Sequence, residues 1–169
     1  MDKIIDSRPL DRPPFKGRIA ASVATRSFLA AVSDCRGLLT GPTAEIFLDG
    51  RNNVGGVSIA LEGGKALAVV IKEFRSYGIN KAKSLFQPSK AAQAWRGACA
   101  LIERGLETPL PLAWLESRKR GFVMESFFLA ERIIEGREIR HLLRELTGDE
   151  LCLLLAALAR TLRVCHERG

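Results

Sequence analysis

The chain has 169 residues, of which 47% are hydrophobic and 27% charged, so it can build a core and is not a disordered tail. Its net charge of +7 and pI near 9.6 predict attraction to something anionic: a nucleotide, a nucleic acid, a phosphorylated lipid or a membrane surface. Aromatic residues make up only 7% of the chain and do not interleave with basic ones, which argues against a nucleic-acid partner.

The cysteines and the apolar segments exclude further classes of protein. The four cysteines are widely and irregularly spaced, which argues against a zinc site or a disulfide framework and favours a reduced, cytosolic compartment. They are Cys35, Cys99, Cys152 and Cys165. The N-terminus does not resemble a signal peptide, and the longest apolar stretch, 151–159, is too short to span a bilayer.

The first half of the chain predicts an arm, a helix and three strands. Residues 1–17 are polar and proline-rich, which favours an extended arm. Apolar residues at helical spacing predict an amphipathic helix over 18–36. Segments 43–49, 54–61 and 66–74 read as strands separated by turns rich in glycine or asparagine, and this order predicts an antiparallel meander.

The second half adds one helix, two strands and further helices. Ser89 is placed to cap a helix that ends at Gly105. Strands are expected over 112–116 and 121–131 around a basic turn, followed by helices over 137–146 and 150–167, the second capped by Asp149. The expected fold is therefore α+β: a five-stranded antiparallel sheet with one helix across it, then a helical region.

Lys72 is the first candidate binding residue, because it ends the apolar run Val-Val-Ile of the third strand. A lysine in such a strand costs desolvation unless an anion meets it, and protein kinases hold ATP phosphates with the lysine of a similar strand, V-A-I-K. In the turn between the first two strands, Arg51, Asn52 and Asn53 could donate hydrogen bonds to phosphate, and Gly55 gives backbone freedom. A lysine that simply reaches water and an ordinary hairpin turn are the alternatives.

Three segments resemble the lipopolysaccharide kinase (Kdo/WaaP-type) family. Residues 85–96 (LFQPSKAAQAWR) are similar to its basic "SKA…W" helix, and residues 104–112 (RGLETPLPL) to its "GxxTPxPL" linker. Residues 125–131 (ESFFLAE) resemble its fifth strand and hinge, and the likeness spans roughly residues 40–169. The resemblance implies a protein-kinase-like small lobe over 41–134, preceded by an arm and helix over 1–40 and followed by the first helices of a large lobe over 135–169.

The same resemblance implies a function. The family uses ATP and magnesium to phosphorylate a sugar, of Kdo or heptose type, in the inner core of lipopolysaccharide. The implied partners are the lipopolysaccharide core or a lipid A precursor and the inner-membrane surface, and the implied location is cytoplasmic and peripheral to that membrane. Lys72 would meet the phosphates, and the backbone of the hinge at Glu131, Arg132 and Ile133 would meet adenine.

The chain departs from the kinase pattern in two places. Kinases pair the strand lysine with a glutamate on the following helix, where this chain has Ala94, and Glu103 comes more than two turns later. Residues 164–169 resemble the end of the helix that leads into the catalytic loop. We therefore expect the general base and the magnesium ligands beyond Gly169, no catalytic or metal-binding residue within the chain, and a truncated chain that is inactive alone.

Two other functions remain open at this stage. A non-catalytic, pseudokinase-like nucleotide-binding or regulatory fragment fits the departures, and a small basic nucleic-acid-binding protein is a weaker option. Some basic residues could meet phosphorylated lipid, although a plain solvated surface is the favoured explanation for each of them. They are Lys81, Lys83, Lys90, Arg118, Lys119 and Arg120. The leucine face of 150–167 predicts self-association if it lacks a partner.

Overall fold

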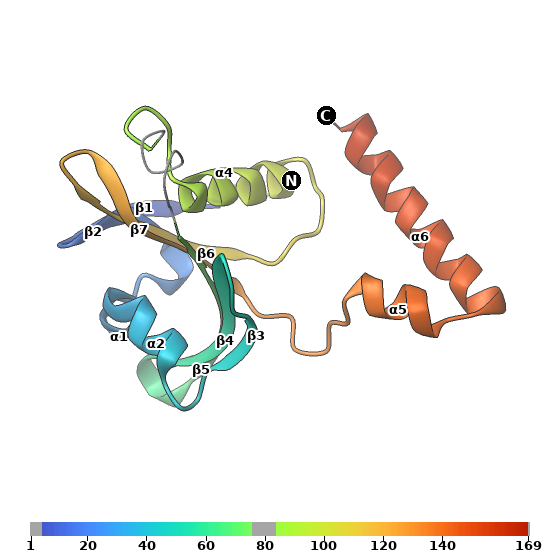
Figure 1. Ribbon diagram of the computed structural model, residues 1–169, viewed down its shortest axis with the longest axis horizontal. Coiled ribbons are helices and arrows are strands. Elements are labelled where there is room, and N and C mark those ends of the chain that lie inside the picture. The colour runs from blue at the N-terminus through green and yellow to red at the C-terminus, as the bar shows by residue number, and fades with distance from the viewer. Residues whose placement is uncertain (1–4, 76–83, 169) are drawn as a thin grey trace.

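The computed structural model describes residues 5–75 and 84–168 and has the α+β architecture expected from the sequence (Figure 1). Its centre is one antiparallel sheet of seven strands in the order β1-β2-β6-β7-β5-β4-β3. The expected count of five strands is therefore wrong. The strands are β1 (Ser7–Arg12), β2 (Phe15–Ala20), β3 (Glu45–Leu48), β4 (Asn52–Ala60), β5 (Ala66–Phe74), β6 (Pro111–Lys119) and β7 (Phe122–Glu131).

Helices cover both faces of this sheet. Figure 1 shows α1 (Arg26–Ala31) and α2 (Cys35–Thr40) below the sheet and α4 (Lys90–Glu103) above it. The remaining helical elements are short turns, η1 (Ala21–Val23), η2 (Val32–Asp34) and η3 (Glu62–Gly64), and the later helices α5 (Ile139–Glu145) and α6 (Gly148–Glu167). The core joins strand residues such as Ile71 and Phe127 to Phe28 of α1 and Trp95 of α4.

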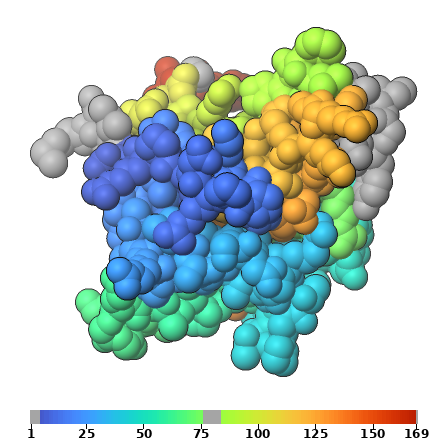
Figure 2. Space-filling model, turned by 90° about the vertical axis from the view of Figure 1, so that its left-hand side faces the viewer, coloured from blue at the N-terminus to red at the C-terminus, as the bar shows by residue number. Residues whose placement is uncertain are grey.

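The two additional strands come from the N-terminus. The arm expected over 1–17 is wrong, because β1 and β2 form a hairpin that pairs with β6. The helix expected over 18–36 is confirmed only in part, because residues 18–20 belong to β2 whereas α1, η2 and the start of α2 make residues 26–36 helical. Figure 2 shows this blue hairpin beside the orange end of β7. The pairing is close, since a Cβ on Gly17 would lie 1.9 Å from the carbonyl oxygen of Trp114. Only a residue without a side chain fits there, a requirement that helical periodicity does not reveal.

The remaining strands follow the expected order: β5 has the expected bounds, β3 and β7 are shorter than expected, and β4 and β6 are longer. The meander β3–β4–β5 is confirmed, and β4 begins at Asn52, within the segment expected to be a turn. The β6–β7 hairpin turns at Arg120 and Gly121, whose φ values of 52° and 84° suit a tight two-residue turn. The basic turn expected over 117–120 therefore begins later, because β6 extends to Lys119, and β7 begins at Phe122.

Helix α4 is confirmed with both of its ends. The Ser89 hydroxyl accepts a hydrogen bond from the amide of Ala92 at 3.2 Å, and Gly105 follows the helix with φ +67°. Trp95 is buried, so this side of α4 packs on the sheet. The helix thus fixes the segment that connects β5 to β6.

Helices α5 and α6 contain no buried residue. The expected cap of α6 is wrong, because Thr147 rather than Asp149 occupies the N-cap position. The end of α6 contacts the end of α4: Arg104 donates to the carbonyl of Arg168 at 3.0 Å, and Arg168 donates to the carbonyl of Arg104 at 2.8 Å. Within residues 5–75 and 84–168, no helix has the length and apolar character needed to cross a membrane.

Candidate functional site

Lys72 lies on β5 between Val54 of β4 and Phe128 of β7, its cross-strand neighbours. Its side chain is half-buried, and its ammonium group stands 5.1 Å from the centre of the Phe74 ring. Within the described part of the chain, no carboxylate forms an ion pair with Lys72. An ammonium that lies over an aromatic ring without a carboxylate partner can bind an external anion.

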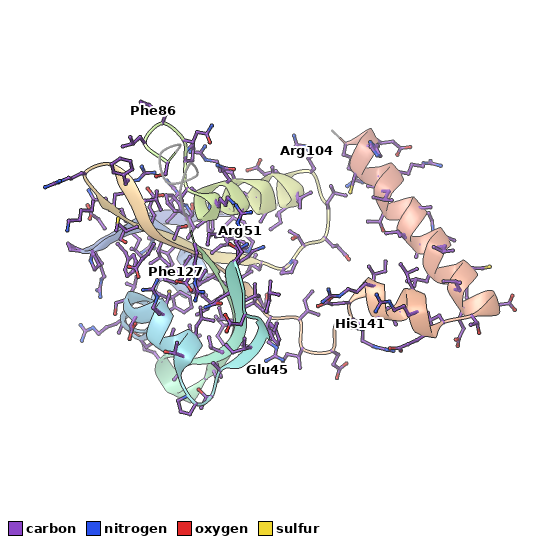
Figure 3. All side chains as sticks on the ribbon, in the orientation of Figure 1. Glu45, Arg51, Phe86, Arg104, Phe127 and His141 are labelled. Atoms are coloured by element: carbon purple, nitrogen blue, oxygen red, sulfur yellow. The ribbon has the colours of Figure 1, made fainter. Side chains whose placement is uncertain are left out.

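The β3–β4 turn lies at the same end of the sheet as Lys72. Asn52 is the cross-strand neighbour of Phe74, and Val54 is the neighbour of Lys72. Because alternate residues of a strand share a face, Asn52 projects from the face that carries Lys72. Its Oδ1 atom is buried and accepts no hydrogen bond from the residues that the structure describes. Arg51 is exposed in the turn itself, labelled in Figure 3.

Two predicted phosphate-binding residues belong to the opposite face. Asn53 donates its side-chain amide to Oε2 of Glu73 at 3.1 Å. A Cβ on Gly55 would lie 2.9 Å from the Leu39 side chain of α2, so this glycine permits packing against a helix. The structure therefore brings Asn52 together with Lys72. Asn53 and Gly55 instead pack on the opposite face of the sheet, against Glu73 and α2.

Glu73 is the residue that sequence reasoning missed. Only 1% of it is exposed, and its carboxylate accepts hydrogen bonds from Arg36 of α2 at 2.6 Å and from Arg75 at 3.2 Å, besides Asn53. Arg75 also donates to the carbonyl of Gly50 at 3.3 Å, which ties the β3–β4 turn to β5. A carboxylate directly after the lysine of an apolar strand was the available signal, since buried charges require partners.

The hinge residues Glu131, Arg132 and Ile133 lie at and after the C-terminal end of β7. The amide of Glu131 donates to the carbonyl of Leu110 at 2.9 Å, and that of Arg132 to the carbonyl of Ala68 at 3.0 Å. In the described part of the chain, the amide of Ile133 has no such backbone acceptor. Glu131 pairs with Val69, three residues before Lys72, a separation of about 10 Å along a strand.

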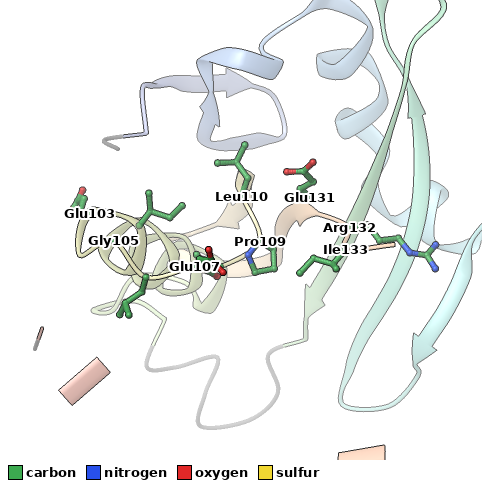
Figure 4. Close-up of a pocket in the computed structure, with 11 residues that line it drawn as sticks. Glu103, Gly105, Glu107, Pro109, Leu110, Glu131, Arg132 and Ile133 are labelled. Atoms are coloured by element: carbon green, nitrogen blue, oxygen red, sulfur yellow. The ribbon is translucent and has the colours of Figure 1, made fainter. Parts of the chain in front are cut away.

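An open pocket of about 1060 Å³ lies beside this hinge (Figure 4). Lys72 and the β3–β4 turn do not line it. Figure 4 shows that the side chain of Arg132 points toward the neighbouring strands, away from Glu131. The pocket is lined by Ile102, Glu103, Gly105, Leu106, Glu107, Thr108, Pro109, Leu110, Glu131, Arg132 and Ile133.

The basic residues expected to meet an anionic surface have different environments. Lys81 and Lys83 lie outside the described residues. Lys90, Lys119 and Arg120 are exposed. The guanidinium of Arg118 instead pairs with Glu116 at 2.6 Å and donates to the carbonyls of Ser84 and Gly121 at 2.8 Å, so it holds the β6–β7 turn in place.

Metal-binding and thiol chemistry find little support in residues 5–75 and 84–168. No group of three or more His, Cys, Asp or Glu side chains there is arranged to hold a metal ion. Burial, with smaller contributions from Asp34 and Glu125, raises the pKa of the Cys35 thiol from 9.0 to about 12, so this cysteine stays protonated near neutral pH. Comparison of the chain with family models, curated proteins and solved structures finds no match.

Proposed function

We propose that this chain is the nucleotide-binding part of a kinase of the lipopolysaccharide type, with Lys72 as the cation for ATP phosphates. The observation that carries the proposal is the register of the meander, which sets Asn52 beside the β3–β4 turn on the same face as Lys72, whose ammonium has no carboxylate partner among the described residues. The sequence likeness of residues 85–96 and 104–112 to that kinase family supports the same assignment.

The nucleotide would lie along β5. Its phosphates would meet Lys72 and Asn52, and its base would lie toward the hinge, where the Ile133 amide has no backbone acceptor within the described part of the chain. About 10 Å of strand separates the two positions, a span that suits an extended nucleotide. Neither magnesium coordination nor phosphoryl transfer is assigned to a described residue, because no group of three or more His, Cys, Asp or Glu side chains among these residues is arranged to hold a metal ion.

The acceptor and the location follow from the resemblance alone. We propose a sugar of the lipopolysaccharide core or a lipid A precursor as the acceptor, and a cytoplasmic site at the inner-membrane surface. The net charge of +7 supports an anionic partner of this kind.

The test is binding of ATP measured by isothermal titration calorimetry. The Lys72→Ala variant should bind ATP at least tenfold more weakly than the unmodified chain, because a charge-assisted contact to phosphate is lost. Lys65→Ala removes the same charge from an exposed position at the end of the η3 turn, before the start of β5, and serves as the control. Equal affinity in the Lys72 and Lys65 variants would remove Lys72 from the site.

A non-catalytic, pseudokinase-like module is the second candidate. The observation that favours it is Ala94, which stands on α4 where kinases place the carboxylate partner of the strand lysine. The kinase hypothesis expects this chain to be inactive alone, so the two candidates are distinguished with the protein encoded by the whole reading frame that contains the chain. The measurement is transfer of labelled phosphate from ATP to delipidated lipopolysaccharide core by that protein. ATP binding without any transfer supports the non-catalytic module, whereas labelled core sugar supports the kinase.

A further inference from the structure

We propose that Arg132 is a gate over the part of the nucleotide-binding face next to the hinge, and that it lowers the affinity for nucleotides without affecting free polyphosphate. The inference rests on the proposed function, because it concerns access to the same face of the sheet. It assigns to Arg132 a regulatory role that differs from a contribution of its backbone to base binding.

Three contacts hold the Arg132 side chain across the sheet. Its Nη2 atom lies 2.5 Å from Oε2 of Glu45 on β3. Its guanidinium carbon stands 5.0 Å from the centre of the Phe47 ring, also on β3. A Cβ on Gly56 of β4 would lie 2.8 Å from its Nη1 atom, so the guanidinium lies directly over that glycine. The side chain thus reaches from the end of β7 to the edge strand.

Strand register places this contact on the same face as Lys72. Gly56 is the cross-strand neighbour of Val70, two residues before Lys72 on β5. Residues two apart in a strand project from the same face, so Val70 and Lys72 share a face with Gly56. A ligand whose phosphates meet Lys72 and whose remainder extends toward the hinge must cross the surface that Arg132 covers.

The contacts that hold the gate are weak enough for a ligand to displace it. The carboxylate partner, Glu45, has a side chain that is 60% exposed, and ion pairs of exposed groups contribute little. A stacked guanidinium at an exposed site adds a similarly modest amount. Together these contacts favour the closed position, in which the Arg132 side chain lies over Gly56, by about three- to tenfold over open positions in which it does not. The apparent affinity of a ligand that needs an open position falls by that factor.

The same contacts have a purely structural explanation, in which Arg132 only stabilises the position of the edge strand β3 relative to β7. The two explanations differ in their consequences for ligands. A structural fastener affects all ligands of the face alike or none, whereas a gate affects only ligands that extend past Lys72. Tripolyphosphate, which has no base or ribose, can occupy the Lys72 end without crossing Gly56.

The experiment compares ATP with tripolyphosphate by calorimetry in four proteins: the unmodified chain, Arg132→Ala, Glu45→Gln and Arg137→Ala. Glu45→Gln releases the gate but keeps Arg132. Arg137→Ala removes the same charge from an exposed arginine that pairs with Glu145 of α5, so it controls for net charge. Thermal unfolding of each variant checks that the fold is retained, and Glu45→Gln keeps the gate testable if Arg132→Ala unfolds.

The ratio of the tripolyphosphate Kd to the ATP Kd is expected to rise about three- to tenfold in Arg132→Ala and by a smaller factor in Glu45→Gln, which keeps the contact of Arg132 with the Phe47 ring. It should stay unchanged in Arg137→Ala. ATP binding that appears only when the gate is released also supports the proposal. An unchanged ratio overturns the gate but leaves the role of Lys72 standing, and a lower ratio in Arg132→Ala shows that Arg132 contacts the nucleotide instead. Failure of all four proteins to bind either ligand overturns the proposed function together with the gate.

Discussion

Lys72 and Glu73 are neighbours on β5, and their side chains leave opposite faces of the sheet. The ammonium of Lys72 rests over Phe74 without a carboxylate partner in the described chain, whereas the carboxylate of Glu73 is buried among Arg36, Asn53 and Arg75. On the Glu73 face, the hydrogen bonds of Asn53 and Arg75 hold the β3–β4 turn against β5. On the opposite face, Lys72 and Asn52 are placed to bind an anion from solution.

The arginine that neutralises Glu73 should matter for stability. Arg36→Ala removes the 2.6 Å ion pair and leaves a carboxylate that is 1% exposed with fewer partners. The free energy of unfolding should fall by about 1.5–3 kcal/mol, as measured by urea denaturation. Arg140→Ala breaks an exposed pair with Glu138 and should change it by less than about 1 kcal/mol. Similar losses in both variants would contradict the importance of the buried network.

The N-terminal hairpin depends on a glycine. A Cβ at position 17 would lie 1.9 Å from the Trp114 carbonyl oxygen, so Gly17→Ala must separate β2 from β6. We expect the free energy of unfolding to fall by about 1–3 kcal/mol and hydrogen exchange in β1 and β2 to become faster. Gly50→Ala provides the matched control, because a Cβ there meets nothing within 4 Å. A Gly17→Ala protein as stable as Gly50→Ala would argue against the β2–β6 pairing.

The Cys35 thiol should make stability depend on pH in the alkaline range. Its pKa is raised by burial to about 12 in the folded chain, against 9.0 when exposed. Above about pH 9 the unfolded chain loses this proton while the folded chain keeps it, so the contribution of Cys35 is fully present below pH 9 and declines toward pH 12. The stability advantage of the unmodified chain over Cys35→Ala should therefore shrink by about 1 kcal/mol per pH unit between pH 9 and 10.5. A constant difference would contradict the burial of the thiol.

Thiol reactivity gives an independent measurement of the same site. Cys152 is exposed on α6, whereas Cys35 is 1% exposed and donates to the Val32 carbonyl at 3.3 Å. With an aromatic disulfide reagent at pH 8, Cys152 should react at once and Cys35 only at the rate of unfolding. Peptide mass mapping after a short pulse identifies the modified cysteine. Rapid labelling of Cys35 in the folded chain would show that its thiol is not buried.

The leucines of α6 should cause self-association. Leu153 is 67% exposed and Leu162 is 52% exposed, and exposed apolar patches favour association. The double variant Leu153→Lys, Leu162→Lys should shift the chain toward monomer in size-exclusion chromatography with light scattering and should bind less of the dye ANS. Thr161→Lys adds charge at another exposed position of the same helix and should change neither. A monomeric, ANS-negative unmodified chain would contradict the expectation.

The sequence alone determined the elements whose signals are local. The β-branched run before Lys72 and the glycine turns predicted the meander, and Ser89 with Gly105 marked the ends of α4, because propensity, capping and turn chemistry act over a few residues. The N-terminal hairpin escaped prediction. Residues 1–17 resemble a proline-rich arm and Ile19 fits the helical spacing of 18–36, and pairing with β6, which is distant in the sequence, makes residues 15–20 a strand.

The tertiary structure alone decided which candidate residues share a site. Asn52 and Asn53 have the same chemistry in the sequence, but the register of β4 against β5 turns Asn52 to the Lys72 face and Asn53 to Glu73. It also placed Arg132 over Gly56, 76 residues away in the sequence. A shift of one residue in strand pairing would exchange the two faces, and pairing depends on contacts between distant segments.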